Sequence, residues 1–431
     1  MHIVVVGGGR MGLPLACCLA EHGATATVSD VNQQLVDAIN AGRCPYEEPG
    51  LEAYLGRNVK EGRLKAATDT TDAVARADAV IVIVPALLTD EKDIDYSILK
   101  AASTDIGRGM RPGTLVCYET TVAVGGTRAQ LIPALEKASG MRAGPDFQVA
   151  FSPERVKANQ VFTKLQETPK VVGGLDPQSL ERAVHLYGDY LGVSVINVGT
   201  LEAAELTKLA GMLYRDVNIA LANELAALSE VVGVDFGAVR EAANTNGEAY
   251  LLLPGIGVGG HCTPVYPHFV IEEAERLGVP QRLAKVAREI NNRQPSRHLA
   301  RLAKEWQPLK DKRVHIMGLG FRPDVKVDPF SPAYDIRDAL LGHHAIVSIE
   351  DPLYTDDELR AKGFTPARIG QEPLDAVVLN TSHSAFATPD FAQWRASGVE
   401  AVVDGRAFWD AQAVQAAGLL YLGVGRGGSA S

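Results

Sequence analysis

The chain opens with His2-Ile3-Val4-Val5-Val6-Gly7-Gly8-Gly9-Arg10-Met11-Gly12, a run of β-branched residues that leads into a glycine-rich loop. The run has the composition of a buried strand, and the residues after Gly12 have that of a helix. A second strand is expected over residues 25–29, directly before Asp30. Strand, glycine loop, helix and strand in this order predict the first unit of a doubly wound parallel sheet.

The same stretch predicts a dinucleotide site. Gly7, Gly9 and Gly12 have the Gly-x-Gly-x-x-Gly spacing, which lets a pyrophosphate approach the backbone at the N-terminus of a helix. Asp30 would accept hydrogen bonds from the adenosine ribose and would repel a 2′-phosphate, so we expect NAD rather than NADP. The alternative interpretation is a glycine-rich turn that binds no nucleotide.

Composition narrows the class of protein. The chain has 431 residues, of which 46% are hydrophobic and 22% charged, so two or three globular domains are expected. A net charge of -10 argues against a nucleic-acid partner. No apolar run is long enough to cross a membrane and no signal segment precedes the first strand, so we expect a cytoplasmic protein. The five cysteines have no CxxC spacing, which disfavours a disulfide framework and a metal site.

The rest of the chain predicts an α/β fold in which two doubly wound Rossmann-like domains are joined by a central domain of long helices. Strands are expected at 2–6, 25–29, 79–84, 114–118, 148–151, 170–172 and 194–198, and again at 313–317, 345–350, 375–379 and 401–403. Long helices are expected at 202–232 and at 281–306, the second interrupted only at Pro295. We therefore place an NAD-binding domain at 1–198, a helical domain at 199–307, a second Rossmann-like domain at 308–422 and a flexible Gly/Ser-rich tail at 423–431.

One cysteine stands in an unusual setting. Cys262 ends the stretch Pro254-Gly255-Ile256-Gly257-Val258-Gly259-Gly260-His261-Cys262, whose glycines allow positive φ angles and leave space around the sulfur. A buried structural thiol needs neither feature. An exposed cysteine in a chain that also binds NAD indicates oxidation through a sulfur-bound carbonyl.

Ordered motifs along nearly the whole chain resemble the UDP-glucose/GDP-mannose dehydrogenase family. The motifs are Gly-Leu-Pro-Leu-Ala at 12–16, Tyr-Glu-Thr-Thr-Val at 118–122, Phe-Ser-Pro-Glu-Arg-Val at 151–156, Thr-Pro-Lys-Val-Val-Gly-Gly at 168–174, Glu-Ala-Ala-Glu-Leu-Thr-Lys-Leu at 202–209, Tyr-Arg-Asp-Val-Asn-Ile-Ala at 214–220, the Cys262 loop and Gly-Leu-Gly-Phe-Arg-Pro-Asp at 318–324. The resemblance implies an NAD-dependent oxidation of C6 of a nucleotide sugar. It also implies a homodimer through the central helices and a nucleotide-sugar site in the last domain.

The resemblance assigns roles to individual residues. Cys262 would capture the aldehyde as a thiohemiacetal, which a second hydride transfer turns into a thioester that water cleaves. Lys208 would stabilise the oxyanion, and Glu154 and Thr121 would handle the attacking water or align the cofactor. The residues expected to bind NAD are Gly7, Gly9, Arg10, Met11, Gly12, Asp30, Pro85 and Thr121. Those expected to bind the substrate are Phe151, Glu154, Lys208, Tyr266, Gly257, Gly259, Phe321 and Arg322.

The chain departs from the family pattern around the substrate. Met212 stands four residues after the lysine, where the family has an asparagine, and Tyr266 stands four residues after the cysteine, where it has an aspartate. Glu248 replaces an arginine, and Pro329 and Phe330 occupy positions that are usually charged. A lost oxyanion donor typically costs about 2.7–4 kcal/mol of transition-state stabilisation. These changes predict an atypical substrate or a weakened hydrolytic step.

Structural roles for four of these residues, and two other functions of the chain, remain as alternatives. Lys208 could be a solvated helix residue, Glu154 an ion-pair partner, Thr121 the end of a strand and His261 a structural histidine. The enzyme could stop at the aldehyde or act on another nucleotide-linked alcohol, as Met212 and Tyr266 suggest. The chain could also be a non-catalytic homologue that only binds nucleotides.

Overall fold

The computed structural model describes residues 1–89, 94–156 and 160–427. The chain folds into two compact units, Met1–Gly211 with His268–Leu277, and Met212–Pro267 with Gly278–Ser431. The boundaries at 198, 307 and 422 that we expected from the sequence stay a prediction. Within the described ranges, no helix is both long enough and apolar enough to cross a membrane.

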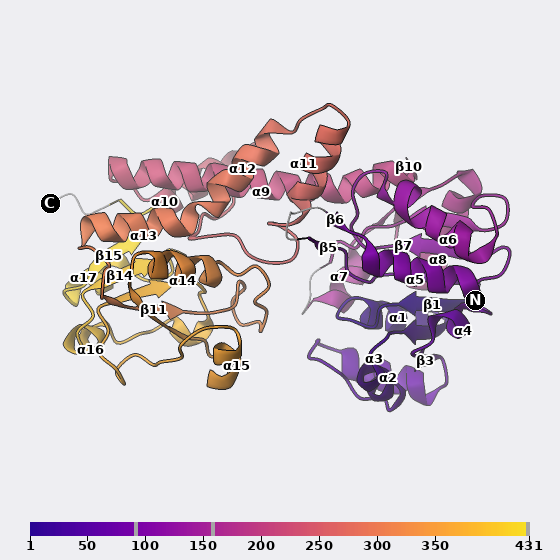
Figure 1. Ribbon diagram of the computed structural model, residues 1–431, viewed down its shortest axis with the longest axis horizontal. Coiled ribbons are helices and arrows are strands. Elements are labelled where there is room, and N and C mark those ends of the chain that lie inside the picture. Colours follow the sequence, from indigo (N-terminus) through magenta and orange to yellow (C-terminus); the bar gives the residue numbers. More distant parts are fainter. Residues whose placement is uncertain (90–93, 157–159, 428–431) are drawn as a thin grey trace. The chain divides into compact units, whose positions relative to one another are not determined.

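An eight-stranded sheet forms the centre of the first unit, with the spatial order β10-β9-β8-β7-β4-β1-β2-β3 (Figure 1). The strands are β1 (His2–Val6), β2 (Thr25–Ser29), β3 (Leu64–Ala67), β4 (Ala79–Val82), β7 (Leu115–Tyr118), β8 (Gln148–Phe151), β9 (Lys170–Gly174) and β10 (Val195–Thr200). β1 pairs in parallel with β2 on one side and with β4 on the other. The chain winding reverses there, which is where doubly wound folds bind ligands.

Helices cover both faces of this sheet. One face packs against α1 (Gly12–Glu21), α3 (Leu51–Lys60), α7 (Val161–Glu167) and α8 (Pro177–Leu191). The other packs against α5 (Ser97–Gly109), α6 (Ile132–Ser139) and the start of α9 (Leu201–Val232). Short elements complete the unit: α2 (Gln33–Asn40), α4 (Thr70–Val74), the β5–β6 hairpin (Leu87–Leu88 with Ile94–Asp95) and a π-helix at Thr127–Leu131.

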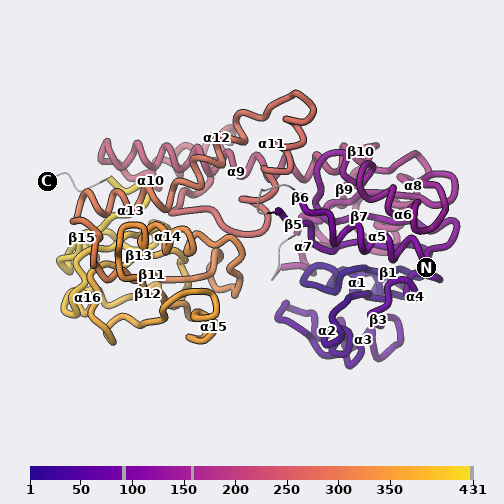
Figure 2. The backbone as a smooth tube through the Cα atoms, viewed as in Figure 1, coloured from indigo at the N-terminus to yellow at the C-terminus, as the bar shows by residue number. Residues whose placement is uncertain are grey.

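The second unit contains a smaller parallel sheet with the order β12-β11-β13-β14-β15. Its strands are β11 (Arg313–Met317), β12 (Ile346–Glu350), β13 (Ala376–Leu379), β14 (Ala401–Asp404) and β15 (Leu420–Gly423). One face packs against α13 (Gln294–Glu305), α14 (Pro332–Gly342) and α15 (Asp356–Ala361), and the other against α16 (Phe391–Ala396) and α17 (Ala411–Ala416). Figure 2 shows α13 beside α14. The helices α10 (Phe236–Ala243) and α12 (Arg282–Asn292) precede α13 in this unit, whereas most of α11 (Tyr266–Arg276) belongs to the first unit. The predicted α/β fold with two Rossmann-like sheets and long central helices is confirmed.

Several details differ from the expectations. The edge strands β3 and β15 were missed, since Leu-Lys-Ala-Ala has no β-branched residue and β15 leads into the glycine-rich tail. The break between α12 and α13 falls at Arg293, and Pro295 lies in the first turn of α13, where its missing N–H costs nothing. Strand β9 runs antiparallel to β8, because it begins at the edge of the sheet where β8 ends.

The tail is also more ordered than expected. Gly423 closes β15, and the N–H of Gly425 donates to Glu230 Oε1 over 3.0 Å. The carbonyl of Gly425 accepts from the N–H of Phe236, so the tail returns to the helical region. These contacts hold the first residues of the tail, while residues 428–431 lie outside the described part of the chain, so the predicted flexible tail stays a prediction.

Candidate active site

The glycine loop after β1 has the geometry that a pyrophosphate requires. Gly7 has a φ of 108°, which strongly favours glycine, and a Cβ on Gly12 would lie 1.9 Å from the carbonyl oxygen of Gly7. By contrast, a Cβ on Gly9 would meet nothing within 4 Å, so the backbone at Gly9 faces open space. The loop is thus closed where the helix packs on the strand and open where a phosphate would approach.

Asp30, at the end of β2, is held in place by two main-chain donors. The N–H of Gly8 donates to Oδ2 over 2.8 Å and that of Asn32 to Oδ1 over 3.0 Å. The carboxylate stays partly exposed beside the loop, as contact with a ribose requires. These features fit NAD.

Tyr46 is a neighbour of this loop that the sequence did not reveal. Its hydroxyl donates to the carbonyl oxygen of Gly9 over 2.7 Å, and the Arg10 guanidinium lies 5.3 Å from the centre of its ring. The segment from Cys44 to Glu52 also lines an open cavity of about 580 Å³. Thirty-seven residues separate Tyr46 from Gly9, so no local pattern signals this contact.

Thr121 follows β7 and is nearly buried, with 5% of its surface exposed. Its loop is fixed by two neighbours, because Thr120 Oγ1 donates to the carbonyl of Val84 and Glu205 accepts N–H bonds from Gly125 and Thr127 at 2.6 and 3.0 Å. Burial raises the pKa of Glu205 to about 7. Pro85, after β4, lies exposed at this edge of the sheet. Glu205 is a second residue that sequence reasoning missed.

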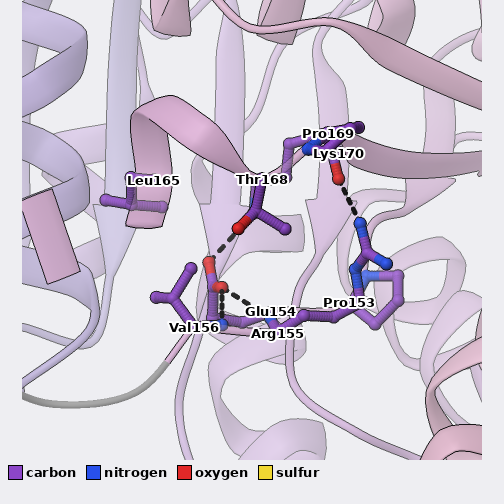
Figure 3. Close-up of a pocket in the computed structure, with 8 residues that line it drawn as sticks. All are labelled: Pro153, Glu154, Arg155, Val156, Leu165, Thr168, Pro169 and Lys170. Atoms are coloured by element: carbon purple, nitrogen blue, oxygen red, sulfur yellow. Dashed lines mark hydrogen bonds and ion pairs between the residues drawn. The ribbon is translucent and has the colours of Figure 1, made fainter. Parts of the chain in front are cut away.

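A buried charge cluster of Glu119, Glu154 and Lys170 lies beside the ends of β7 and β8, and Figure 3 draws Glu154 and Lys170. Lys170 Nζ lies 2.7 Å from Glu119 Oε2 and 3.1 Å from Glu154 Oε2. The other oxygen of Glu154 accepts from the N–H groups of Arg155 and Val156. Both oxygens of Glu154 are therefore engaged, and its ion-pair partner is Lys170 rather than the adjacent Arg155, whose guanidinium binds the carbonyl of Pro169.

The cluster separates the pKa values of its two carboxyl groups. Burial raises the pKa of Glu119 to about 7, although Lys170 opposes the shift. Burial would also raise the pKa of Glu154, but Lys170 and the main-chain donors keep it below the ordinary value. Glu154 is therefore the ionised partner of the lysine near neutral pH, while Glu119 titrates there.

Lys208 and Phe151 lie close to this cluster in the chain's first unit. Lys208, on α9, donates from Nζ to the main-chain oxygen of Glu154 over 2.6 Å. Lys208 is thus oriented by the protein instead of extending freely into solvent. Phe151, the last residue of β8, is fully buried in the apolar core. The expected role of Phe151 in substrate binding stays a prediction, and its buried side chain leaves the main chain at the end of β8 as the part that could contact a substrate.

In the second unit, the glycines of the Cys262 loop permit close packing. Gly260 has a φ of 103°, and its N–H donates to the carbonyl of Pro329 over 3.0 Å. A Cβ on Gly259 would lie 2.5 Å from Phe321 Cβ, and one on Gly257 would lie 2.7 Å from Pro332. The loop therefore rests on the segment that carries Phe321 and Arg322, as the expected shared role in substrate binding requires.

Cys262 itself is partly exposed, and its carbonyl accepts from the N–H groups of Val265 and Tyr266 at the start of α11. Burial lowers the pKa of His261, although Asp328 opposes the shift, and the His261 ring lies edge-on to Phe330. A neutral histidine would not activate the neighbouring thiol by its charge. The residues Cys17, Cys18 and Cys117 are buried, and nowhere in 1–89, 94–156 and 160–427 do His, Cys, Asp and Glu side chains form a metal-binding group.

The sheet of the second unit repeats the local design of the first with one change. Asp351, after β12, accepts from the N–H groups of Leu319 and Gly320 at 2.7 and 3.0 Å, as Asp30 does from Gly8. However, its side chain is completely buried and lies 3.2 Å from His383 Nε2. Asp351 cannot reach a ribose, so this loop does not form a second dinucleotide site like the one formed by the glycine loop after β1 and Asp30. Arg322 remains partly exposed at this loop.

Comparisons with known proteins agree with this geometry. Three family models match in order: the NAD-binding domain at residues 1–191, the central domain at 202–293 and the UDP-binding domain at 315–411 of the UDP-glucose/GDP-mannose dehydrogenase family. The chain belongs to this family. It is an NAD-dependent dehydrogenase of nucleotide sugars, as the resemblance implied.

Individual relatives cover almost the full length. The chain is 31% identical to an NDP-N-acetyl-D-galactosaminuronic acid dehydrogenase of Ralstonia nicotianae, over 96% of this chain and 97% of the relative. It is also 31% identical to a UDP-N-acetyl-D-mannosamine dehydrogenase of Pyrococcus horikoshii, over 99% and 100%. A solved structure of the UDP-D-ManNAc dehydrogenase from P. horikoshii matches with a TM-score of 0.88 at 29% identity, over 99% of this chain and 100% of the other.

Proposed function

We propose that this dehydrogenase oxidises the C6 primary alcohol of a nucleotide-linked N-acetylhexosamine to a carboxylate. The observation that carries the proposal is the partly exposed Cys262 in a loop packed against the segment of Phe321 and Arg322. The sugar class is suggested by relatives named for N-acetyl-D-galactosaminuronic acid, UDP-N-acetyl-D-mannosamine and UDP-N-acetyl-D-glucosamine. Met212, Tyr266 and Glu248 support a substrate other than UDP-glucose.

The proposed role of Cys262 is covalent. The C6 alcohol first loses a hydride and its hydroxyl proton to give an aldehyde. The Cys262 sulfur adds to this aldehyde to give a thiohemiacetal, and loss of a second hydride and the hydroxyl proton turns the adduct into a thioester. Water then cleaves the thioester and returns the thiol with the carboxylate product. NAD, when bound, supplies the hydride acceptor. Lys208 would stabilise negative charge on the C6 oxygen, and Glu154 and Thr121 stay the expected partners of the water or the cofactor.

The test is the number of NADH molecules formed for each substrate molecule consumed. UDP-N-acetyl-D-mannosamine, UDP-N-acetyl-D-glucosamine, UDP-N-acetyl-D-galactosamine and UDP-glucose form the panel, with absorbance followed at the nicotinamide band. Two NADH per N-acetyl sugar are expected, and Cys262→Ser should lower this turnover by at least about 100-fold. Efficient turnover of UDP-glucose alone would contradict the proposed sugar class.

A second candidate function is oxidation that stops at the aldehyde or acts on another nucleotide-linked alcohol. Met212 favours it, because methionine cannot donate a hydrogen bond to the oxyanion as an asparagine could. This function predicts one NADH per substrate molecule. A nucleotide-binding protein without catalysis predicts none.

We also propose a homodimer through α9. The exposed apolar residues Leu206, Tyr214, Leu221 and Leu228 recur every seven or eight residues along it. Because two helical turns take about 7.2 residues, they form one stripe on the helix. A second copy of the chain would cover this stripe, so light scattering should give twice the chain mass of 45.9 kDa. A cytoplasmic location, and the absence of nucleic-acid and membrane partners, stay predictions.

A further inference from the structure

The charge cluster around Lys170 invites a functional explanation. Lys170 and Glu119 are almost completely buried, and the side chain of Glu154 is only 11% exposed. A buried ion pair is seldom more stable than apolar side chains of the same size, because desolvation offsets the attraction. The three charges are therefore poorly explained by stability alone.

Contacts around the cluster fix Lys170 from three sides. Its ammonium lies between the two carboxylates and 5.1 Å from the centre of the Tyr187 ring. The Tyr187 hydroxyl donates to Glu119 Oε1 over 2.7 Å, so the carboxylate that holds Lys170 is itself held. Tyr187 lies on α8 and Glu119 follows β7, which makes the arrangement part of the sheet packing.

Lys170 in turn determines where Glu154 lies. The Glu154 N–H donates to the carbonyl of Glu119 over 3.2 Å, while its carboxylate binds Lys170. The remaining main-chain group, the Glu154 carbonyl, accepts the 2.6 Å hydrogen bond from Lys208. A displacement of Glu154 would therefore move the ammonium of Lys208 as well.

We propose that Lys170 is a positioning residue, which orients the Lys208 ammonium by fixing the Glu154 main chain at the end of β8. The inference rests on the proposed role of Lys208 at the C6 oxyanion. An oxyanion donor is effective only when its position is set before charge develops, because a mobile ammonium would have to reorganise during the reaction. Glu119 and Tyr187 support the same geometry through their contacts with Lys170.

The test compares Lys170→Met, Lys208→Met and the double variant in the full chain, with NAD and the nucleotide sugar of the panel that turns over fastest. Lys170→Met should lower kcat by about 10- to 100-fold and leave the KM for NAD within about 2-fold. In the Lys208→Met background, the same change should lower kcat no further, because its effect passes through Lys208. Lys170→Arg, which keeps the positive charge, should restore most of the activity.

Controls separate this role from general stability. Tyr118→Phe removes the buried hydroxyl contact of 2.7 Å with Ser103 on the opposite face of the sheet from Tyr187, so it should lower the melting temperature without lowering kcat. If Lys170→Met does not fold, Glu119→Gln replaces it, since the glutamine keeps the size and the Tyr187 contact. It should lower kcat by about 5-fold when Lys208 is present, and not when Lys208 is methionine.

Two results would overturn the inference. One is an unchanged kcat in the Lys170 variant, or a loss that adds fully to that of Lys208→Met. The other is structural and does not depend on an enzyme assay. It is a crystal structure of Lys170→Met in which Lys208 still binds the Glu154 carbonyl as before. If Lys208→Met itself leaves kcat unchanged, the proposed function of Lys208 fails instead.

Discussion

At the scale of single residues, Asp30 and Asp351 make the same kind of contact in the two sheets. Each follows the second strand of its sheet and accepts from the glycine loop, but the two differ in burial. Asp30 binds the glycine loop and stays partly exposed, whereas Asp351 binds the equivalent loop but is sealed against His383. Only Asp30 can take part in recognising a ribose.

Asp30→Ala should therefore weaken the preference for NAD over NADP. The change removes a charged hydrogen-bond acceptor, worth about 1.5–3 kcal/mol, and also the repulsion of a 2′-phosphate. The ratio of kcat/KM values for NAD and NADP should fall by about 10- to 100-fold in steady-state assays. Asp37→Ala, at an exposed carboxylate on the next helix, should leave the ratio unchanged. An unchanged ratio in Asp30→Ala would refute the assignment.

The positions of the glycine loops and of Asp30 could be recognised because the glycine spacing is local and Asp30 directly follows an expected strand, 22 residues after Gly8, while their roles stay predictions. Tyr46, Lys170 and Glu205 could not, because their partners lie 37, 51 and about 80 residues away in the sequence. Only the folded sheet brings these residues to one edge. Glu154 shows the same limit, since its motif was recognised but its partner Lys170 was not.

At the scale of elements, periodicity predicted the interior strands and α9 well. It failed for β3, for β15 and for the direction of β9, which depend on edge position and on the path of the connection. Helix α9 also has a role that its hydrophobic pattern does not predict. Through Glu205, it caps the backbone that follows Thr121.

This cap makes stability depend on pH. Burial raises the pKa of Glu205 from an ordinary value of 4.5 to about 7, so the folded state holds a proton that the unfolded chain has lost. The contribution of protonated Glu205 to the free energy of unfolding is complete below about pH 4.5 and disappears as the pH rises through 7. Glu205→Gln should therefore flatten the fall in melting temperature between pH 5 and 8, measured by calorimetry.

The matched control lies on the same helix. The pKa of Glu202 is lowered by its hydrogen bond with Arg128. Glu202→Gln should therefore not flatten the fall in melting temperature between pH 5 and 8. Some slope should remain in Glu205→Gln, because Glu119 titrates in the same window. A wild-type melting temperature that rises from pH 5 to 8, with the same slope in Glu205→Gln, would contradict the account.

At the scale of the whole molecule, the chain combines a dinucleotide-binding sheet with a second sheet whose loop supports the cysteine. The proposed function requires Cys262 to carry the substrate carbon between the two oxidations. Turnover with NAD and the best N-acetyl sugar of the panel should be quenched with acid and the protein digested for mass spectrometry. The Cys262 peptide should gain the mass of the nucleotide sugar less four hydrogens, the mass of a thioester formed after two oxidations. Complete conversion to the uronate with no adduct on Cys262, and with Cys262→Ala turning over at the wild-type rate, would contradict it.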